Sequence, residues 1–452
     1  MELNTFSQQK IFIHERILSS MQGYQKISEA LKKSEGERVK VRGWIYRTRS
    51  SGKLAFVTVR DESGIIQVIV EKGKLPDEDF NSARKALIES SVEVEGTVHE
   101  DERAPNGREL HATSFHVIHF AEDFPITKDQ SMEFLLDNRH LWLRSRKLTT
   151  ILKIRSTLTG AIHEFFRNHD FYEFHPPILQ PSQCEGGATL FEVNYYGGKT
   201  YLSQSWQLYA EAAIFALERV YDVAPTFRAE RSKTSRHLSE FWMAEMEAAW
   251  FDLKEVTEFA KKEVKFIIKK ILEKHEEDLR FLGREPETLK EMLDKKWPTI
   301  KYREALEILK KDGMEVPFGK DLRTIEEQKL MEHFDTPVVV THYPKEAMAF
   351  YKPRDPDHPD EALCFDMLAP EGYGEIVGGS QRSTDINELI ESLQKQGEDV
   401  EKYEWYLDLR RYGSVPHSGY GLGVERSLAW ICKLDNIKDA IPFPRTITRK
   451  YP

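Results

Sequence analysis

Between residues 39 and 120 the chain alternates short apolar runs with polar, turn-forming stretches. β-branched and aromatic residues dominate the runs, and stretches such as Ser50-Ser51-Gly52 and Asp61-Glu62-Ser63-Gly64 separate them. Runs of this length bounded by Gly, Ser and Asp are typical of short β-strands. Five in succession predict a small Greek-key barrel of the oligonucleotide-binding kind over residues 36–120. The runs comprise residues 39–45, 56–59, 65–70, 92–94 and 115–120.

The pattern changes after this predicted barrel. We expect residues 121–145 to form a linker, and residues 1–35, which favour helix, to form an N-terminal helical extension. Apolar residues recur at helical spacing from Ile151 to Phe165, before an extended segment with two prolines. From Thr336 onward, short apolar runs and Gly- and Pro-rich turns predict antiparallel sheet with a final helix after Gly423. The chain therefore reads as a multidomain α+β protein, with residues 146–452 forming an antiparallel-sheet domain that contains a mainly helical insertion at 251–335. Residues 251–315 are rich in Lys and Glu, and we expect these charges to form a solvated face.

Composition limits the possible classes of protein. The 452 residues are 40% hydrophobic and 31% charged, which is typical of soluble globular domains. No apolar run approaches the ~18 residues of a membrane span, and no secretory segment is recognisable, so we expect a cytoplasmic protein. Three separated cysteines (Cys184, Cys364, Cys432) and 15 histidines form no C-x-x-C or H-E-x-x-H pattern. The net charge of −10 argues weakly against nucleic-acid binding, although a local basic surface could still neutralise phosphates.

Three segments carry residues suited to a nucleoside triphosphate. Residues 227–242 place arginines near carboxylates on a predicted hairpin, and guanidinium groups pair bidentately with phosphate. Residues 419–426 place glycines before Arg426 in a predicted first helical turn, where its side chain could face a phosphate. Asp366 and Glu375 could hold Mg²⁺ against triphosphate oxygens. Each segment alone also fits a simpler interpretation: a surface hairpin with ion pairs, a plain glycine turn, or an exposed acidic strand pair.

Together the three segments resemble the catalytic motifs of class II aminoacyl-tRNA synthetases. Phe227-Arg228-Ala229-Glu230 looks like motif 2, residues 421–426 like motif 3, and the helix and strand ending at Pro176-Pro177 like motif 1. The class I signatures H-I-G-H and K-M-S-K-S are absent. Val41-Arg42-Gly43-Trp44, Phe56 and Gln67 are similar to the anticodon-binding barrel of the aspartyl, asparaginyl and lysyl subgroup. The resemblance spans residues 36–452 and implies a class II catalytic domain, ATP as substrate, Mg²⁺ as cofactor, tRNA as partner, and a homodimer.

The resemblance also implies a role for individual residues. Arg228 would stabilise charge at the α-phosphate and, with Arg426, is the expected catalytic group. Glu230 would orient the adenosine and Phe241 would stack on adenine, while Arg236, His237 and Arg426 would hold the β- and γ-phosphates. The full set expected to bind ATP is Arg228, Glu230, Arg236, His237, Leu238, Phe241, Glu375, Gly423 and Arg426.

The same resemblance assigns metal and anticodon contacts. Glu375 would be the main Mg²⁺ ligand. Relatives of the archaeal aspartyl type carry a Ser three residues later that would supply a second contact, but this chain has Gly378 there. Asp366 is therefore the candidate for the second contact. In the barrel, Arg49, Phe56 and Gln67 match residues that meet the anticodon. A ring on a strand gives a base a stacking surface. The other interpretation of Phe56 is barrel core.

The identity of the amino acid depends on residues 205–211. Arg382 matches an arginine that holds the substrate's side-chain carbonyl in both aspartyl and asparaginyl enzymes. Aspartyl enzymes resemble S-P-Q-L-Y-K-Q here, whereas this chain has Ala210 in place of the lysine, followed by Glu211. Loss of a cation and gain of an anion would favour the neutral amide of asparagine, with its NH₂ donating to Glu211. The α-ammonium would meet Gln207 and Glu185, and the other interpretation of Glu211 is a solvated helix position.

Residues 378–382 and 405–419 also closely resemble asparaginyl enzymes. The sequence therefore predicts a ligase of the asparaginyl-tRNA synthetase type, which activates L-asparagine with ATP and transfers it to the 3′ end of tRNA(Asn). The sequence leaves three rival functions open. They are an aspartyl-tRNA synthetase, whether discriminating or non-discriminating; a relative that makes asparagine from aspartate and ammonia without tRNA; and an inactive nucleic-acid-binding protein that keeps the fold.

Overall fold

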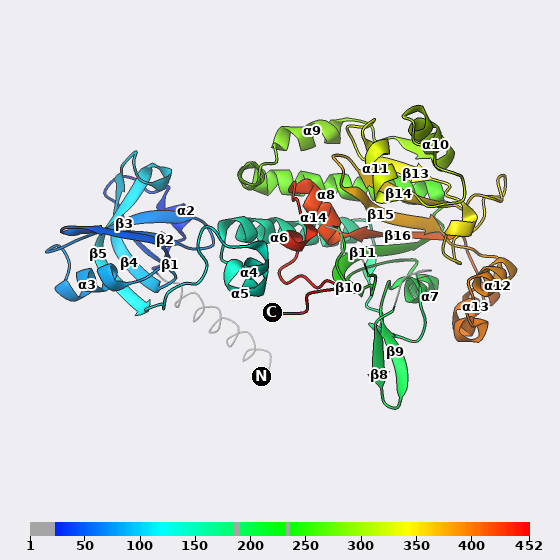
Figure 1. The fold of residues 1–452 in the computed structure, drawn as a ribbon, viewed down its shortest axis with the longest axis horizontal. Coiled ribbons are helices and arrows are strands. Elements are labelled where there is room, and N and C mark those ends of the chain that lie inside the picture. The colour runs from blue at the N-terminus through cyan, green and yellow to red at the C-terminus, as the bar shows by residue number, and fades with distance from the viewer. Residues whose placement is uncertain (1–22, 185–189, 232–235) are drawn as a thin grey trace, which may run out of the picture. The chain divides into compact units, whose positions relative to one another are not determined.

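The computed structural model describes residues 23–184, 190–231 and 236–452. The chain divides into two compact units, residues 1–135 and 136–452, which are described separately (Figure 1). Within the described residues, every helix is too short or too polar to cross a membrane.

The N-terminal unit is a closed barrel of five strands in the order β1-β2-β3-β5-β4, which confirms the predicted fold. Alternate residues of β2, Ala55, Val57 and Val59, are fully buried and fill the barrel interior. Phe56, between them, is only half-buried and points outward, so it is not barrel core. The strands are β1 (Arg38–Ser51), β2 (Leu54–Arg60), β3 (Ile65–Glu71), β4 (Ser91–Glu100) and β5 (Arg108–His119), and helices α2 (Ile27–Ala30) and α3 (Asp77–Lys85) pack against them.

The C-terminal unit is built on an eight-stranded sheet of order β12-β13-β14-β15-β16-β11-β10-β6. Only the pairs β12–β13 and β10–β6 are parallel, so the sheet is mainly antiparallel, as predicted. The strands are β6 (Tyr172–Glu173), β10 (Arg219–Phe227), β11 (Glu240–Ala249), β12 (Thr299–Lys301), β13 (Val338–Thr341), β14 (Cys364–Ala369), β15 (Gly374–Gln381) and β16 (His417–Gly423). A smaller sheet, β7 (Leu179–Gln180), β9 (Gly198–Leu202) and β8 (Glu192–Tyr195), extends from this unit (Figure 1).

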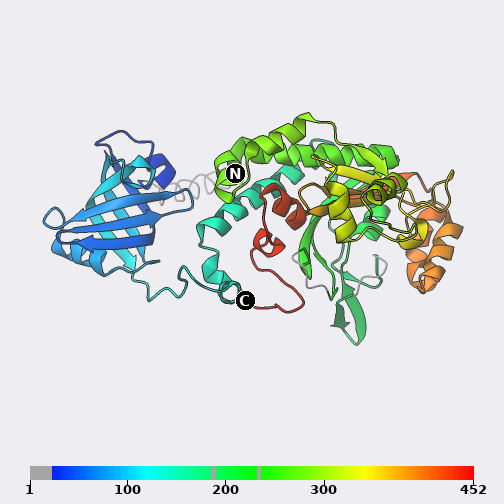
Figure 2. The ribbon, with the colours of Figure 1, turned by 45° about the horizontal axis from the view of Figure 1, so that its top comes forward.

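Helices α6 (Arg146–Arg167), α8 (Leu253–Leu282) and α14 (Val424–Ile431) pack their apolar faces onto one side of the large sheet. Figure 2 shows α6, in teal, beside α8, in green. Along β11, Ala244, Met246 and Ala248 belong to this core. Because side chains alternate along a strand, Glu245 and Glu247 lie on the opposite side of the sheet. That side carries the candidate site.

Three regions differ from the sequence prediction. The expected linker at 121–145 contains helices α4 and α5, whose bounds are Met132–Asp137 and Arg139–Trp142. Helices α12 (Ile386–Lys395) and α13 (Glu404–Arg411) lie where only sheet and turns were expected. The charged residues of the 251–315 stretch were expected to form a solvated face, yet Lys261 and Glu263 of α8 are buried. Each has a buried partner, because Lys261 Nζ donates to the backbone oxygen of Trp297 at 3.2 Å and Tyr420 Oη donates to Glu263 Oε2 at 2.5 Å. The remaining helices are α7 (Gln207–Leu217), α9 (Pro286–Asp294), α10 (Tyr302–Lys311) and α11 (Thr324–Met331).

Candidate active site

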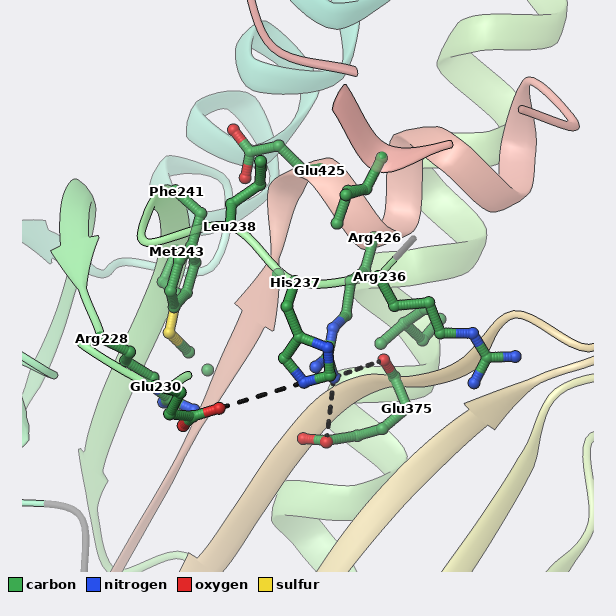
Figure 3. A pocket seen from close by; sticks show the side chains of 14 residues that line it. Arg228, Glu230, Arg236, His237, Leu238, Phe241, Met243, Glu375, Glu425 and Arg426 are labelled. Atoms are coloured by element: carbon green, nitrogen blue, oxygen red, sulfur yellow. Dashed lines mark hydrogen bonds and ion pairs between the residues drawn. The ribbon is translucent and has the colours of Figure 1, made fainter. Parts of the chain in front are cut away.

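A cavity of about 610 Å³ lies where the β10–β11 hairpin, β15, β16 and the first turn of α14 meet (Figure 3). All nine residues that the sequence assigned to ATP line this one cavity, although they come from segments almost 200 residues apart. Its wall consists of Arg228, Glu230, Arg236, His237, Leu238, Phe241, Met243, Glu375, Ile376, Gly421, Gly423, Glu425, Arg426 and Ile437.

One part of the cavity wall is strongly cationic. Arg426 Nη1 lies 3.1 Å from Glu375 Oε2, and His237 Nε2 lies 4.0 Å from Glu230 Oε2 (Figure 3). Burial opposes ionisation of Glu375, but Arg426 and Arg228 outweigh it and hold its pKa below the usual value. Burial and the charge of Arg426 lower the pKa of His237, so this imidazole is mostly neutral at neutral pH. Three arginines in one cavity suit a polyphosphate, because guanidinium groups bind phosphate oxygens in pairs.

Another part of the wall is apolar. Phe241 packs against a small buried cluster of Leu238, Ile437 and Ile441. The guanidinium carbon of Arg228 lies 5.5 Å from the centre of the Phe241 ring. A flat aromatic ring on an apolar wall suits a planar base, since such rings stack favourably.

A second cavity, of about 590 Å³, adjoins the first. The two share four wall residues, namely Arg228, Met243, Glu375 and Gly421. The other residues that line the second cavity are Ser205, Trp206, Gln207, Glu245, Met246, Tyr351, Lys352, Asp366, Gly378, Gly379, Arg382 and Tyr420. A group that bridges the cavities would therefore lie beside Arg228.

Arg382 is held rigidly at the wall of the second cavity. Its Nε and Nη2 donate to the buried carboxylate of Glu247 at 3.0 and 2.9 Å, and Nη1 donates to Ser380 Oγ at 2.8 Å. Gly419 makes room for this pair, because a Cβ at that position would lie 2.1 Å from Glu247 Oε2. Two N–H groups of the guanidinium remain for a further acceptor, since Arg has five donors and three are used.

Glu211 lies behind this cavity rather than on its wall. It is fully buried on α7, so it is not a solvated helix position. Its carboxylate accepts hydrogen bonds from Gln207, Tyr406, Arg410 and His417. Four donors fill the roughly four lone-pair positions of a carboxylate. Glu211 was expected to contact the substrate amide directly, but it does not line the cavity. Gln207, which donates to Glu211, lines the cavity instead. Glu185, the other expected contact, lies outside the described residues.

The two candidate metal ligands face the same space. A Cβ on Gly378 would lie 2.8 Å from Glu375 Oε1 and 3.4 Å from Asp366 Oδ1, so the glycine leaves room between the carboxylates. Burial, with the nearby charges of Glu375 and Asp321, raises the pKa of Asp366 well above its usual value. A divalent cation would relieve this repulsion. In the described parts of the chain, no three His, Cys, Asp or Glu residues form a metal cluster, but Mg²⁺ commonly takes one or two carboxylates plus phosphate and water.

The predicted anticodon residues share the outer face of the barrel. The Arg49 guanidinium carbon lies 4.4 Å from the centre of the Phe56 ring, and the two residues pair across β1 and β2. Gln67 Nε2 donates to Glu109 Oε2 at 2.8 Å. Phe56 pairs with Ile69, two residues beyond Gln67 on β3, so the ring and the amide lie on the same surface.

Sequence reasoning missed several charged residues of the site. Glu245 and Glu247 alternate along strand β11, which is otherwise apolar after Glu240, and this spacing indicates two buried carboxylates that face one side. Glu245 Oε1 accepts from Ser205 Oγ at 2.5 Å. Tyr406 and Arg410, spaced four residues apart, share the buried face of α13.

Comparison with known proteins agrees with this arrangement. A family model described as "tRNA synthetases class II (D, K and N)" matches residues 131–447, and one described as "OB-fold nucleic acid binding domain" matches residues 39–118. The chain is 48% identical to the asparagine–tRNA ligase of Thermoplasma acidophilum and 49% identical to that of Thermococcus gammatolerans, each over 92% of this chain and 97% of the relative. It superposes on the crystal structure of asparaginyl-tRNA synthetase from Pyrococcus horikoshii, complexed with asparaginyl-adenylate, with a TM-score of 0.91 and 46% identity. That match covers 95% of this chain and 99% of the other.

Proposed function

The chain belongs to the asparagine–tRNA ligases, a family of class II tRNA synthetases, and we propose that it activates L-asparagine with ATP and transfers it to tRNA(Asn). The observation that carries this proposal is the pair of adjoining cavities that share Arg228. One cavity has the arginines and the aromatic ring that ATP needs, and the other has Gln207 and Arg382 for the amino acid.

The first step takes place where the cavities meet. A carboxylate oxygen of asparagine attacks the α-phosphorus of ATP, the bond from that phosphorus to the bridging oxygen breaks, and pyrophosphate leaves with the electron pair. Arg228 stabilises the charge that builds on the α-phosphate oxygens, and the positions of Arg236, His237 and Arg426 suit the departing phosphates. Phe241 stacks on adenine and Glu230 orients the adenosine. Holding both reactants in line supplies much of the remaining rate enhancement.

In the second step the terminal ribose of the tRNA attacks the carbonyl carbon of the adenylate. The hydroxyl oxygen forms the new ester bond, the bond from the carbonyl carbon to the phosphate oxygen breaks, and AMP leaves with the electron pair while the hydroxyl proton passes to its phosphate. The 3′-hydroxyl is the expected nucleophile, as in class II enzymes. Arg228 remains beside the leaving phosphate and so acts in both steps.

Recognition of asparagine uses the side chains at the far end of the second cavity. The two unused N–H groups of Arg382 suit the side-chain carbonyl of asparagine. Gln207 accepts from the substrate's N–H groups, and Glu211 acts through Gln207. A buried carboxylate in place of the amide would need an additional cation, so aspartate binds less well.

Mg²⁺, a homodimer and a cytoplasmic location are further parts of this proposal. Glu375 and Asp366 would hold Mg²⁺, which neutralises phosphate charge when it is bound. Exposed apolar residues after helix α6, Tyr172, Ile178 and Leu179, support pairing of two subunits through the motif 1 segment. In the barrel, Arg49, Phe56 and Gln67 form the surface that would receive unstacked anticodon bases.

Pyrophosphate exchange with each amino acid tests the function. We expect asparagine-dependent incorporation of labelled pyrophosphate into ATP to exceed aspartate-dependent incorporation by at least 100-fold in kcat/KM, a difference of roughly 2.7 kcal/mol. Faster exchange with aspartate would contradict the choice of asparagine. Exchange with neither amino acid would favour an inactive nucleic-acid-binding protein.

The comparisons favour neither an aspartyl enzyme nor an enzyme that forms asparagine without tRNA. Three relatives at 48–49% identity, each matched over 97% of its length, are asparagine–tRNA ligases, whereas an aspartyl-tRNA synthetase from Entamoeba histolytica is 26% identical. An asparagine-forming enzyme that acts without tRNA has no use for an anticodon barrel, and the barrel is present here.

A further inference from the structure

The carboxylate of Glu211 is enclosed by four hydrogen-bond donors. Oε1 accepts from Gln207 Nε2 at 2.9 Å, and Oε2 accepts from Tyr406 Oη at 2.8 Å and His417 Nε2 at 3.0 Å. Arg410 Nη2 donates to Oε2 at 2.5 Å. Glu211 is completely buried, as are the side chains of Arg410 and His417. The ion pair between Arg410 and Glu211 therefore lies inside the protein and not on its surface.

Arg410 is the counter-charge that allows Glu211 to be ionised there. Burial alone would raise the pKa of Glu211, but Arg410, followed by His417, outweighs burial and holds it below the usual range. Arg410 is fixed in turn, because its Nε donates to the backbone oxygen of Ser383 at 2.9 Å and its guanidinium stacks on the Tyr406 ring at 4.2 Å. An unpaired carboxylate at this depth would be strongly destabilising.

Glu211 also determines how Gln207 presents itself to the second cavity. A carboxylate only accepts hydrogen bonds, so the NH₂ of Gln207 must face Glu211. The carbonyl oxygen of the same amide is then left for the cavity, whose wall includes Gln207. Without Glu211 the amide could rotate and present either group.

The charges at this end of the cavity balance as two pairs. Arg382 is matched by Glu247 at 2.9 Å, and Arg410 is matched by Glu211. The charge of Arg410 is thus balanced by Glu211, and Arg410 is not among the residues that line the second cavity. A neutral amide meets no uncompensated charge there, whereas aspartate would bring an anion without a partner.

We propose that Arg410 is a positioning residue for substrate selection, which acts through Glu211 on Gln207, while Glu211 neutralises Arg410 so that no spare cation remains at this end of the cavity. The inference rests on the proposed function, since it concerns how the same cavity distinguishes asparagine from aspartate. It assigns that selectivity to a pair of residues behind the cavity, one on α7 and the other on α13.

Three variants test this proposal: E211Q, R410M and the double variant E211Q/R410M. Each is assayed by pyrophosphate exchange for the KM of asparagine, aspartate and ATP, and by thermal unfolding. In E211Q, Arg410 becomes a free cation, so the asparagine-to-aspartate ratio of kcat/KM should fall at least tenfold, while the KM for ATP changes less than twofold. R410M should unfold at lower temperature and raise the KM for asparagine at least tenfold, measured where it remains folded.

The double variant separates positioning from simple support of the fold. Removing both charges should restore the unfolding temperature toward that of the unmodified protein, yet the KM for asparagine should stay raised because Gln207 is no longer fixed. R411M is the matched control, because Arg411 neighbours Arg410 but is part-exposed and pairs with Glu404 and Asp408. It should leave all three KM values unchanged.

Two results would overturn the inference. One is an unchanged asparagine-to-aspartate ratio in E211Q. The other is a double variant that recovers the original KM for asparagine, which would make the pair purely structural. If R410M fails to fold, E211Q and the double variant still decide. Failure of the proposed function is distinguishable, because it would appear in the unmodified protein as preferential exchange with aspartate or none at all.

Discussion

Glu263 gives a quantitative prediction about stability and pH. It lies on helix α8, is fully buried beneath the sheet, and accepts a hydrogen bond from Tyr420 Oη at 2.5 Å. Its other oxygen, Oε1, has no hydrogen-bond partner among the described residues. Burial raises the pKa of this carboxyl to about 8 from an ordinary value of 4.5, so the folded protein carries Glu263 in its neutral form.

The consequence for stability follows from proton binding. Between pH 4.5 and about 8 the folded state keeps the Glu263 proton while the unfolded chain loses it. The folded state therefore binds one more proton in this window, so the free energy of unfolding falls as pH rises through it. At about 1.4 kcal/mol per pH unit, the loss across the window is on the order of 5 kcal/mol.

Replacement by glutamine removes this loss. The amide oxygen of E263Q can still accept from Tyr420, and its NH₂ takes the place of the oxygen that already lacks a partner. We expect the unmodified protein and E263Q to differ by less than ~1 kcal/mol at pH 5, because both are neutral there. At pH 8 the variant should be more stable by several kcal/mol.

Urea unfolding at pH 5, 6, 7 and 8, followed by tryptophan fluorescence, measures the difference. E273Q is the matched control, because Glu273 lies on the same helix but is exposed, and its effect should not vary with pH. A stability difference for E263Q that stays constant from pH 5 to 8 would refute the reasoning, since it would mean that Glu263 does not hold its proton in the folded state.

Two further predictions concern the anticodon surface and the subunit contact. F56A should raise the KM for tRNA by about tenfold or more, because base stacking contributes roughly 1–3 kcal/mol, and it should leave tRNA-free pyrophosphate exchange intact. An unchanged KM for tRNA would exclude stacking on Phe56. Y172E places a charge on a side chain that is 60% exposed after α6, so light scattering at micromolar concentration should show half the mass of the unmodified protein. I325E, at a residue that is 62% exposed on α11, should keep the larger mass, and a monomeric unmodified protein would contradict the proposed dimer.

The sequence could predict those features that depend on residues close together in the chain. The barrel strands follow from short apolar runs separated by turn residues, although only the structure shows that Val57 and Val59 point inward and Phe56 outward. The residues of the ATP cavity lie within a few short motifs, each recognisable without knowledge of the others. Their convergence on a single cavity follows from the pairing of β11, β15 and β16, which the sequence predicted only as antiparallel sheet.

The parts that could not be predicted depend on contacts between distant segments. Glu211 lies 199 residues from Arg410 and 206 from His417, so nothing near it in sequence reveals that its charge is balanced. Considered alone, the change to Glu211 reads as a plain gain of negative charge. Glu263 was missed for the same reason, because a charged residue in a Lys- and Glu-rich helix is normally solvated, and only the packing of α8 onto β16 buries it.

The shared wall of the two cavities has a consequence for inhibition. Because Arg228 and Glu375 border both spaces, one molecule that joins an asparagine-like end to an adenosine-like end can occupy them together. Linking the ends loses translational and rotational freedom once instead of twice, so affinity should exceed that of either half by orders of magnitude. The amide end would direct such a compound toward enzymes with this charge-balanced cavity, and the adenosine end would supply most of the binding strength.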